Sequence, residues 1–235
     1  MRISIKTTKG RKQKERSIIT SITIEYSNQC TVSSLFDTII SMKNIILTGI
    51  KHSGKSTVGK ALAAAASLYF YDVDAVIEET EKISVRSLYT EQGEAGFKKA
   101  EYQAVIKILT LIENNQQSGK AVISTGGGIC ANDKALSLLR ENGILVFLDV
   151  SEEVSVSRII ENSKRSGSYP AYISRHNPET EEDVRRIYHT FYTERVSLYK
   201  KLADISIEAD TGSDYHASVQ ENCRKILSYL PNHSI

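Results

Sequence analysis

Short apolar runs alternate with longer amphipathic stretches from residue 42 to the C-terminus. Apolar runs of about four to eight residues rich in Ile, Val, Leu and Phe predict buried strands, and apolar residues spaced three or four apart predict helices. The predicted strands cover Ile45–Thr48, Leu68–Tyr71, Ala121–Thr125, Ile144–Asp149 and Ala203–Ile207. The predicted helices cover Lys55–Ala66, Ile83–Asn114 with an interruption near Gly93 and Gly96, Asn132–Asn142, Ser151–Asn162, a stretch from Thr180 to about Lys201, and Tyr215–Leu230.

Strands and helices alternate along this part of the chain, which is typical of an α/β protein whose parallel sheet is covered by helices on both faces. We therefore expect a three-layer fold with a central parallel sheet of about five strands. Two helix starts carry capping signals. Ser151 is followed by Glu152 and Glu153, and Thr180-Glu181-Glu182-Asp183 resembles a capping box.

The first 41 residues differ from the rest of the chain in charge. They carry seven basic and three acidic residues, whereas residues 42–235 carry 23 basic and 25 acidic residues. The charge-dense stretch Lys9–Arg16 is expected to be solvated and poorly ordered, and Ser17–Tyr26 alternates enough to form an edge strand. We interpret residues 1–41 as an accessory extension or an upstream mis-start before Met42, with an organelle transit peptide as the alternative, and residues 42–235 as the functional domain.

Composition argues against several classes of function. The body of the chain is near neutral, so its charge gives no argument for nucleic-acid binding. No apolar run approaches the roughly 18 residues of a membrane-spanning helix. Cys30, Cys130 and Cys223 are isolated, with no CxxC pair to indicate a zinc site or a disulfide framework. A cytoplasmic protein that binds neither nucleic acid nor membrane is therefore expected.

The segment Gly49-Ile50-Lys51-His52-Ser53-Gly54-Lys55-Ser56 fits the phosphate-binding pattern G-x-x-x-x-G-K-[ST] between a predicted strand and a predicted helix. Its glycines let several backbone N–H groups converge on one phosphate, beside the positive N-terminus of the helix. Lys55 places a charge between the β- and γ-phosphates, and the Ser56 hydroxyl is a suitable Mg²⁺ ligand. The residues expected to bind ATP here are Gly49, His52, Ser53, Gly54, Lys55, Ser56 and Thr57.

Two other segments follow predicted strands. Alternate residues of an extended segment share a face, so Asp72 and Asp74 are expected to point the same way, one holding magnesium and the other receiving or orienting a hydroxyl proton. A pair of solvated loop acids is the alternative. The Gly126-Gly127-Gly128 run suits close approach of the main chain to a ligand, and a flexible turn is its alternative.

Five segments in this order resemble the motifs of the shikimate kinase family. They are the P-loop, Asp72-Val73-Asp74, Phe97-Lys98-Lys99-Ala100-Glu101, Gly126-Gly127-Gly128 and Arg195-Val196-Ser197-Leu198-Tyr199. The resemblance covers about residues 43–230. It implies a P-loop NTPase fold with a mobile lid near residues 164–178. It also implies a monomer that uses Mg²⁺ and transfers the ATP γ-phosphate to the 3-hydroxyl of shikimate, a small carboxylated polyol.

The resemblance further implies roles for individual residues. Asp74 would contact the substrate hydroxyl and accept its proton, while Asp72 would help to hold magnesium. The glycine run Gly126–Gly128 would bind the substrate, with Gly127 offering its backbone N–H. Arg195 would grip the substrate carboxylate.

Two segments depart from the family pattern. Lys98 stands where the family has arginine, with Glu101 one helical turn away to orient it, and replacing a two-pronged guanidinium by a point charge predicts that Lys98→Arg tightens substrate binding. In the lid, Tyr169 stands where the family has an arginine on the ATP phosphates. Arg165 is our first candidate for that catalytic role and Arg175 the second.

Two alternative functions remain open from the sequence. The departures at Lys98 and in the lid keep another small-molecule kinase of the same architecture in view, such as a gluconate-type kinase. A nucleotide-binding protein that has lost catalysis is the other, although Lys55, Ser56 and both aspartates are retained.

Overall fold

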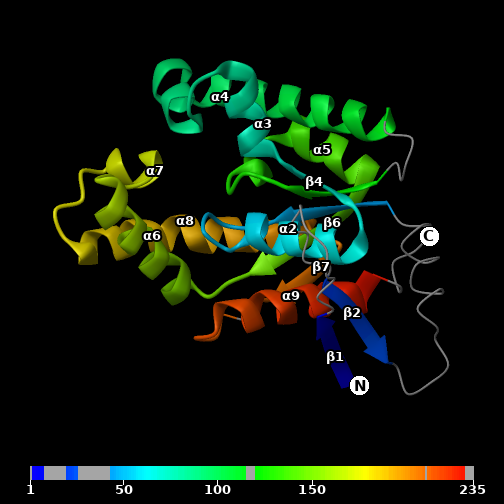
Figure 1. Ribbon diagram of the computed structural model, residues 1–235. Coiled ribbons are helices and arrows are strands. Elements are labelled where there is room, and N and C mark those ends of the chain that lie inside the picture. The colour runs from blue at the N-terminus through cyan, green and yellow to red at the C-terminus, as the bar shows by residue number, and fades with distance from the viewer. Residues whose placement is uncertain (1, 8–19, 26–42, 115–119, 210, 231–235) are drawn as a thin grey trace, which may run out of the picture.

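The computed structural model describes residues 2–7, 20–25, 43–114, 120–209 and 211–230. Its centre is a five-stranded sheet in the order β4-β5-β3-β6-β7, in which every neighbouring pair is parallel (Figure 1). The strands are β3 (Asn44–Thr48), β4 (Tyr69–Asp72), β5 (Ala121–Ser124), β6 (Gly143–Asp149) and β7 (Ile205–Glu208). The expected parallel α/β fold is therefore confirmed.

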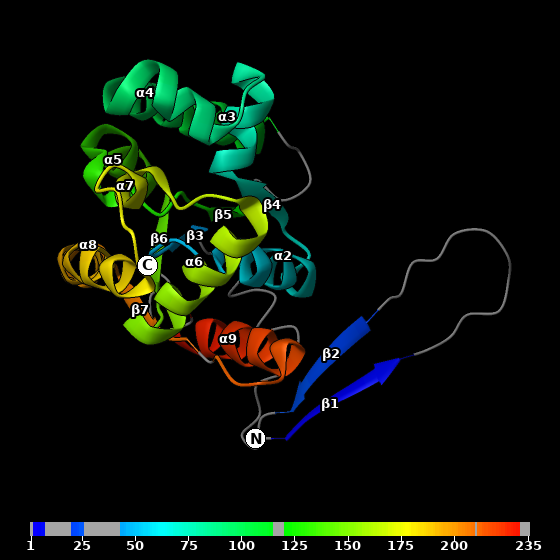
Figure 2. The same cartoon turned by 90° about the vertical axis from the view of Figure 1, so that its left-hand side faces the viewer.

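Helices cover both faces of this sheet. On one face lie α2 (Lys55–Ala66) and α9 (Tyr215–Tyr229), and Figure 2 shows them on the opposite side of the strands from α4 and α5. The other helices are α3 (Val73–Glu81), α4 (Val85–Glu113), the 3₁₀ turn η1 (Ile129–Ala131), α5 (Asp133–Asn142), α6 (Glu152–Ser166), α7 (Ala171–Ser174) and α8 (Glu181–Leu202).

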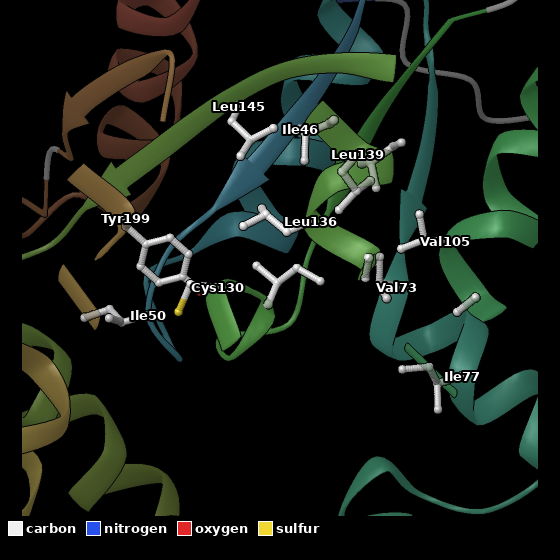
Figure 3. Close-up of a cluster of buried hydrophobic side chains, with 14 of the residues drawn as sticks. Ile46, Ile50, Val73, Ile77, Val105, Cys130, Leu136, Leu139, Leu145 and Tyr199 are labelled. Carbon is white, nitrogen blue, oxygen red and sulfur yellow. The ribbon is translucent and has the colours of Figure 1, made fainter. Parts of the chain in front are cut away.

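Alternating side chains of the central strands divide the core into two clusters. Ile46 and Leu145 point into one cluster, with α4, α5 and α8 (Figure 3). In this cluster Phe147 stacks on the ring of Tyr199. Ile45 and Leu47 point into the other, against α2 and α9. This two-sided burial explains why the strand sequences read as continuous apolar runs.

Most predicted boundaries are confirmed within about three residues. Helix α2 has the predicted bounds, and the capping box at the start of α8 is present, with Thr180 and Asp183 bonding to each other's backbone N–H. The long helix α4 is interrupted at Gly93, where φ is +68°, whereas Gly96 lies within the helix. Helix α6 runs four residues beyond the predicted end, to Ser166. Helix α3, the turn η1 and helix α7 were not predicted from the sequence.

The described parts of the N-terminal segment form a separate two-stranded sheet. Strand β1 (Arg2–Thr7) pairs antiparallel with β2 (Thr20–Glu25), which lies inside the stretch expected to form an edge strand. The charge-dense stretch Lys9–Arg16 lies outside the described residues, so the interpretation of residues 1–41 as an extension stays a prediction. In the part of the chain that the structure describes, no helix has the length and apolar character needed to cross a membrane.

Candidate active site

The candidate site is a cleft of about 940 Å³ at the carboxyl ends of the central strands. In parallel α/β sheets, ligands bind at this edge. A crevice forms here where the connections that follow two neighbouring strands run to opposite faces of the sheet. Segments from seven parts of the chain meet in the cleft. They are the P-loop with the start of α2, the start of α3, the first part of α4, the glycine run after β5, α6 with the lid, α8, and the start of α9.

The P-loop wraps around the side chain of Lys55. Gly54 caps α2 with φ +92°, a left-handed conformation that favours glycine, and His52 also has a positive φ of +62°. The buried Lys55 ammonium donates to the carbonyls of Gly49 at 2.9 Å and Ile50 at 2.8 Å. The loop therefore holds a cationic group at the N-terminus of a helix, which is the arrangement that binds phosphate.

Positive charge dominates the surroundings of this loop. Burial lowers the pKa of Lys55 to about 8, although Asp74 and Asp72 oppose that shift. Burial also lowers the pKa of His52 to about 4, and the nearby charges of Lys51, Lys55, Arg158 and Arg165 act in the same direction. His52 is therefore neutral at pH 7, in an electropositive environment suited to a polyphosphate.

Ser56 and Asp72 form the part of the site that could hold a metal ion. The Ser56 hydroxyl donates to Asp72 Oδ2 at 2.6 Å and lies 3.3 Å from the Ser124 hydroxyl. Among the described residues no group of three or more His, Cys, Asp or Glu side chains could hold a metal. Magnesium does not need such a cage, because it is commonly held by one or two protein oxygens together with phosphates and water. The oxygen donors present fit Mg²⁺.

Asp72 and Asp74 do not lie on one extended segment, so that expectation is wrong. Asp72 ends β4 and caps α3, where its Oδ1 accepts the N–H groups of Asp74 and Ala75. The strand stops here because this capping carboxylate satisfies the free N–H groups of a new helix. Asp74 thus sits in the first turn of α3, and the turn, not the strand pleat, directs it into the cleft.

The carboxyl group of Asp74 is buried beside a second buried acid. Burial raises the pKa of Asp74, the neighbouring Asp72 raises it further, and Lys55 opposes the shift. Asp74 Oδ1 has no hydrogen-bond partner among the described residues, and neither has Glu101 Oε1. A Cβ atom at Gly126 would lie 2.9 Å from Asp74 Oδ1 and 3.2 Å from Glu101 Oε1, so a glycine here lets both acids approach the loop.

Lys98 lies outside the cleft, in contrast to the expectation from the sequence. Its ammonium pairs with Glu94 at 2.7 Å, one turn earlier on the same exposed helix face. Glu101 does not orient Lys98. Instead, Glu101 Oε2 accepts a hydrogen bond of 2.8 Å from Asn132, and burial raises the pKa of Glu101 to about 7. Lys98 lies outside the cleft because it pairs with an acid four residues earlier on the same helix, which is the ordinary reach of a helical ion pair.

The glycine run lies between the P-loop and Arg195. A Cβ at Gly127 would lie 2.7 Å from the Lys51 nitrogen, so the two loops pack backbone against backbone. The carbonyl of Gly127 accepts a hydrogen bond of 3.0 Å from Arg195. No group in the described part of the chain accepts the N–H of Gly126, Gly127 or Gly128, so these donors are available to a ligand.

The lid contributes Arg165 but not Arg175 to the cleft lining. Arg165 has no ion-pair partner among the described residues, and it lies in the last turn of α6. The Arg175 guanidinium lies over the ring of Phe191, 5.3 Å from its centroid. Arg158 was not predicted from the sequence, although it lines the cleft and donates to the His52 carbonyl at 2.9 Å. Its signal was the spacing of seven residues from Arg165, which puts both on one helix face.

Two other cleft residues were missed. Tyr215, at the start of α9, donates its hydroxyl to Thr57 at 3.0 Å, and Arg86, at the start of α4, bonds to the Ser168 hydroxyl in the lid. Neither belongs to a sequence pattern, because each reaches the cleft only through the packing of its helix against the sheet.

Comparison with known proteins gives consistent matches. The family model described as shikimate kinase matches residues 51–231. A shikimate kinase from Sulfurihydrogenibium sp. (strain YO3AOP1) is 36% identical over 169 residues, covering 72% of this chain and 89% of the relative. One from Aquifex aeolicus (strain VF5) is 35% identical, covering 71% of this chain and 86% of the relative. A solved structure described as shikimate kinase from Acinetobacter baumannii in complex with shikimate has the same fold, with a TM-score of 0.68, 23% identity, and coverage of 84% of this chain and 98% of that one. Their shared sequence and fold over most of the chain show that this protein belongs to the shikimate kinase family.

Proposed function

We propose that this protein phosphorylates the 3-hydroxyl of shikimate with ATP, forming shikimate 3-phosphate and ADP. One observation carries the proposal beyond family membership. A single cleft holds the P-loop lysine Lys55, the buried carboxyl group of Asp74, and the guanidinium of Arg195. No carboxylate in the described part of the chain forms an ion pair with Arg195, so it is available for the carboxylate of an acceptor.

The P-loop end of the cleft binds the nucleotide in this proposal. Backbone N–H groups of the loop and the Lys55 ammonium bind the β- and γ-phosphates, with the α2 N-terminus adding to the positive potential. Ser56 and Asp72 would hold Mg²⁺, which when bound neutralises charge that develops on the phosphates. Arg165 approaches the γ-phosphate from the lid and stabilises the same charge.

The other end binds the acceptor. Arg195 pairs with the acceptor carboxylate, and the free N–H groups of the glycine run bind its oxygens. Asp74 orients the attacking hydroxyl and accepts its proton as the oxygen bonds to phosphorus and the bond from phosphorus to the ADP oxygen breaks. Phosphoryl transfer depends mainly on position and charge stabilisation, so one correctly placed carboxylate is sufficient.

An acceptor panel tests the proposal. ADP formation is followed in a coupled assay with ATP and Mg²⁺, using shikimate, gluconate or no acceptor, beside calorimetric titration with ATP. Turnover with shikimate alone supports the proposal, and Asp74→Asn should lower kcat at least about 100-fold with little change in ATP affinity. Turnover with gluconate instead would support a gluconate-type kinase. ATP binding without turnover of any acceptor would support a protein that has lost catalysis.

We also propose that the active form is a monomer, as the resemblance to the family implies. The buried, unpaired thiols of Cys130 and Cys223 are consistent with a reducing cytoplasmic setting, which we also propose.

A further inference from the structure

Two aromatic rings hold the guanidinium of Arg195. Its central carbon lies 5.3 Å from the ring centroid of Tyr172 and 5.6 Å from that of Phe191. The two rings contact each other, with centroids 4.7 Å apart and planes inclined by 54°. Cations are attracted to aromatic faces at such distances, and arginine does this most often. The rings and the Gly127 carbonyl together set the position of Arg195.

The three contacts leave Arg195 able to bind an anion. A carboxylate partner would neutralise the guanidinium and compete with a ligand, whereas a ring face uses none of its N–H donors. Gly127 accepts from Nη1, and no other hydrogen bond from the guanidinium is formed within the described residues. The aromatic pair therefore fixes the direction of the guanidinium while its remaining donors stay available.

Tyr172 belongs to the lid, while Phe191 belongs to the long helix α8. The short helix α7 is anchored, because Ile173 is fully buried and the Ser174 hydroxyl donates to the Tyr169 carbonyl at 2.9 Å. Tyr172 also lines the cleft, and burial raises the pKa of its hydroxyl. The ring is thus part of the same lid that carries Arg165, and it lies against Arg195 in the same cleft.

We propose that Tyr172 is a positioning residue that sets acceptor affinity by holding Arg195 in its binding orientation. The inference rests on the proposed function, since it assigns Arg195 to the acceptor carboxylate. Tyr172 links the lid, whose Arg165 belongs to the nucleotide end of the proposed site, to Arg195 at the acceptor end. The phenol hydroxyl is not required, because the contact is made by the ring.

Steady-state kinetics of three lid variants test this inference. Tyr172→Leu keeps apolar bulk but removes the ring, Tyr172→Phe keeps the ring, and Tyr169→Leu removes a lid tyrosine that does not contact Arg195. Tyr172→Leu should raise KM for shikimate about tenfold, with KM for ATP and kcat changed less than about threefold. Tyr172→Phe and Tyr169→Leu should keep wild-type KM for shikimate within about twofold.

A second background separates positioning from general damage. In an Arg195→Lys background, the Tyr172→Leu change should have at most a twofold further effect, because the group that the ring holds has been replaced. Urea unfolding reports whether each variant is folded. If Tyr172→Leu does not fold, Phe191→Leu removes the other ring and should give the same selective rise in KM for shikimate.

Four results would count against the inference. Unchanged KM for shikimate in Tyr172→Leu, or equal changes in both KM values, would overturn it while leaving the proposed function intact. A full tenfold effect in the Arg195→Lys background would also overturn it. Absence of shikimate turnover by the wild-type protein would overturn the inference and the proposed function together.

Discussion

Neighbouring glycines at the centre of the cleft should tolerate a methyl group very differently. A Cβ at Gly127 would lie 2.7 Å from the backbone nitrogen of Lys51 and 3.1 Å from its Cα, whereas the nearest atom to a Cβ at Gly128 is an Arg195 nitrogen at 3.8 Å. Ordinary contacts to a Cβ begin near 3.4 Å, so Gly127→Ala must push two backbone segments about 0.7 Å apart. Gly128 has φ −119° and ψ 4°, which alanine adopts without the strain of a positive φ.

The displacement at Gly127 affects both halves of the site, because this loop contacts the P-loop on one side and Arg195 on the other. Misplacement of reacting groups by about 1 Å can lower rates about 100-fold, so Gly127→Ala should reduce kcat/KM for shikimate by about that factor. Overpacking of this kind typically destabilises a protein by about 1–3 kcal/mol. Gly128→Ala should lower kcat/KM no more than about threefold.

The coupled assay with shikimate, together with urea unfolding of each variant, distinguishes these outcomes. The kinetic loss in Gly127→Ala should persist under conditions where the variant is fully folded. Equal activity of the two alanine variants would refute the reasoning, because it would mean that the close contact between the glycine run and the P-loop does not position either substrate.

Three other predictions concern single charged groups. Lys98→Arg should leave KM for shikimate within about twofold, because Lys98 pairs with Glu94 outside the cleft; a severalfold fall in KM would restore the role suggested by the sequence. Arg165→Ala should lower kcat at least about 100-fold and Arg175→Ala less than about threefold, and the reverse order in the coupled assay would contradict our choice of lid arginine. Burial raises the pKa of Glu101 from 4.5 to about 7, so between these pH values the folded state keeps a proton that the unfolded state has released. The free energy of unfolding should therefore fall as the pH rises from 4.5 to about 7. Glu101→Gln should flatten this slope in urea unfolding from pH 4.5 to 8, and an unchanged slope would show that Glu101 does not titrate in this range.

The sequence predicts the nucleotide end of the site better than the acceptor end, for a physical reason. A P-loop is a local structure in which strand, glycines and helix follow one another within a short segment. Lys55 and the bounds of α2 could therefore be predicted from residue types and spacing alone. The acceptor end depends on groups from α3, α4, η1 and α8, whose relative positions are set by packing in the core.

Asp74 and Lys98 illustrate what spacing cannot decide. The spacing of Asp-x-Asp fits the alternation of a strand, but a carboxylate at the end of a strand can also cap a following helix. Asp72 does so here, and α3 begins at the next residue. Lys98 has two acids within helical reach, Glu94 and Glu101. The exposed one forms the ion pair, because Glu101 is buried and already accepts a hydrogen bond from Asn132.

The buried ionisable groups of the cleft have pKa values shifted against their charged forms. Burial lowers the pKa of Lys55 and raises those of Asp74 and Glu101. Keeping such groups charged in the folded protein opposes folding, and a ligand of complementary charge reverses part of that effect. Phosphate near Lys55 would favour the ammonium form, and a hydroxyl near Asp74 would donate a hydrogen bond to the carboxylate form. ATP and an acceptor should therefore stabilise the fold more than their contact area alone suggests, because they relieve the same electrostatic penalties that prepare these residues for phosphoryl transfer.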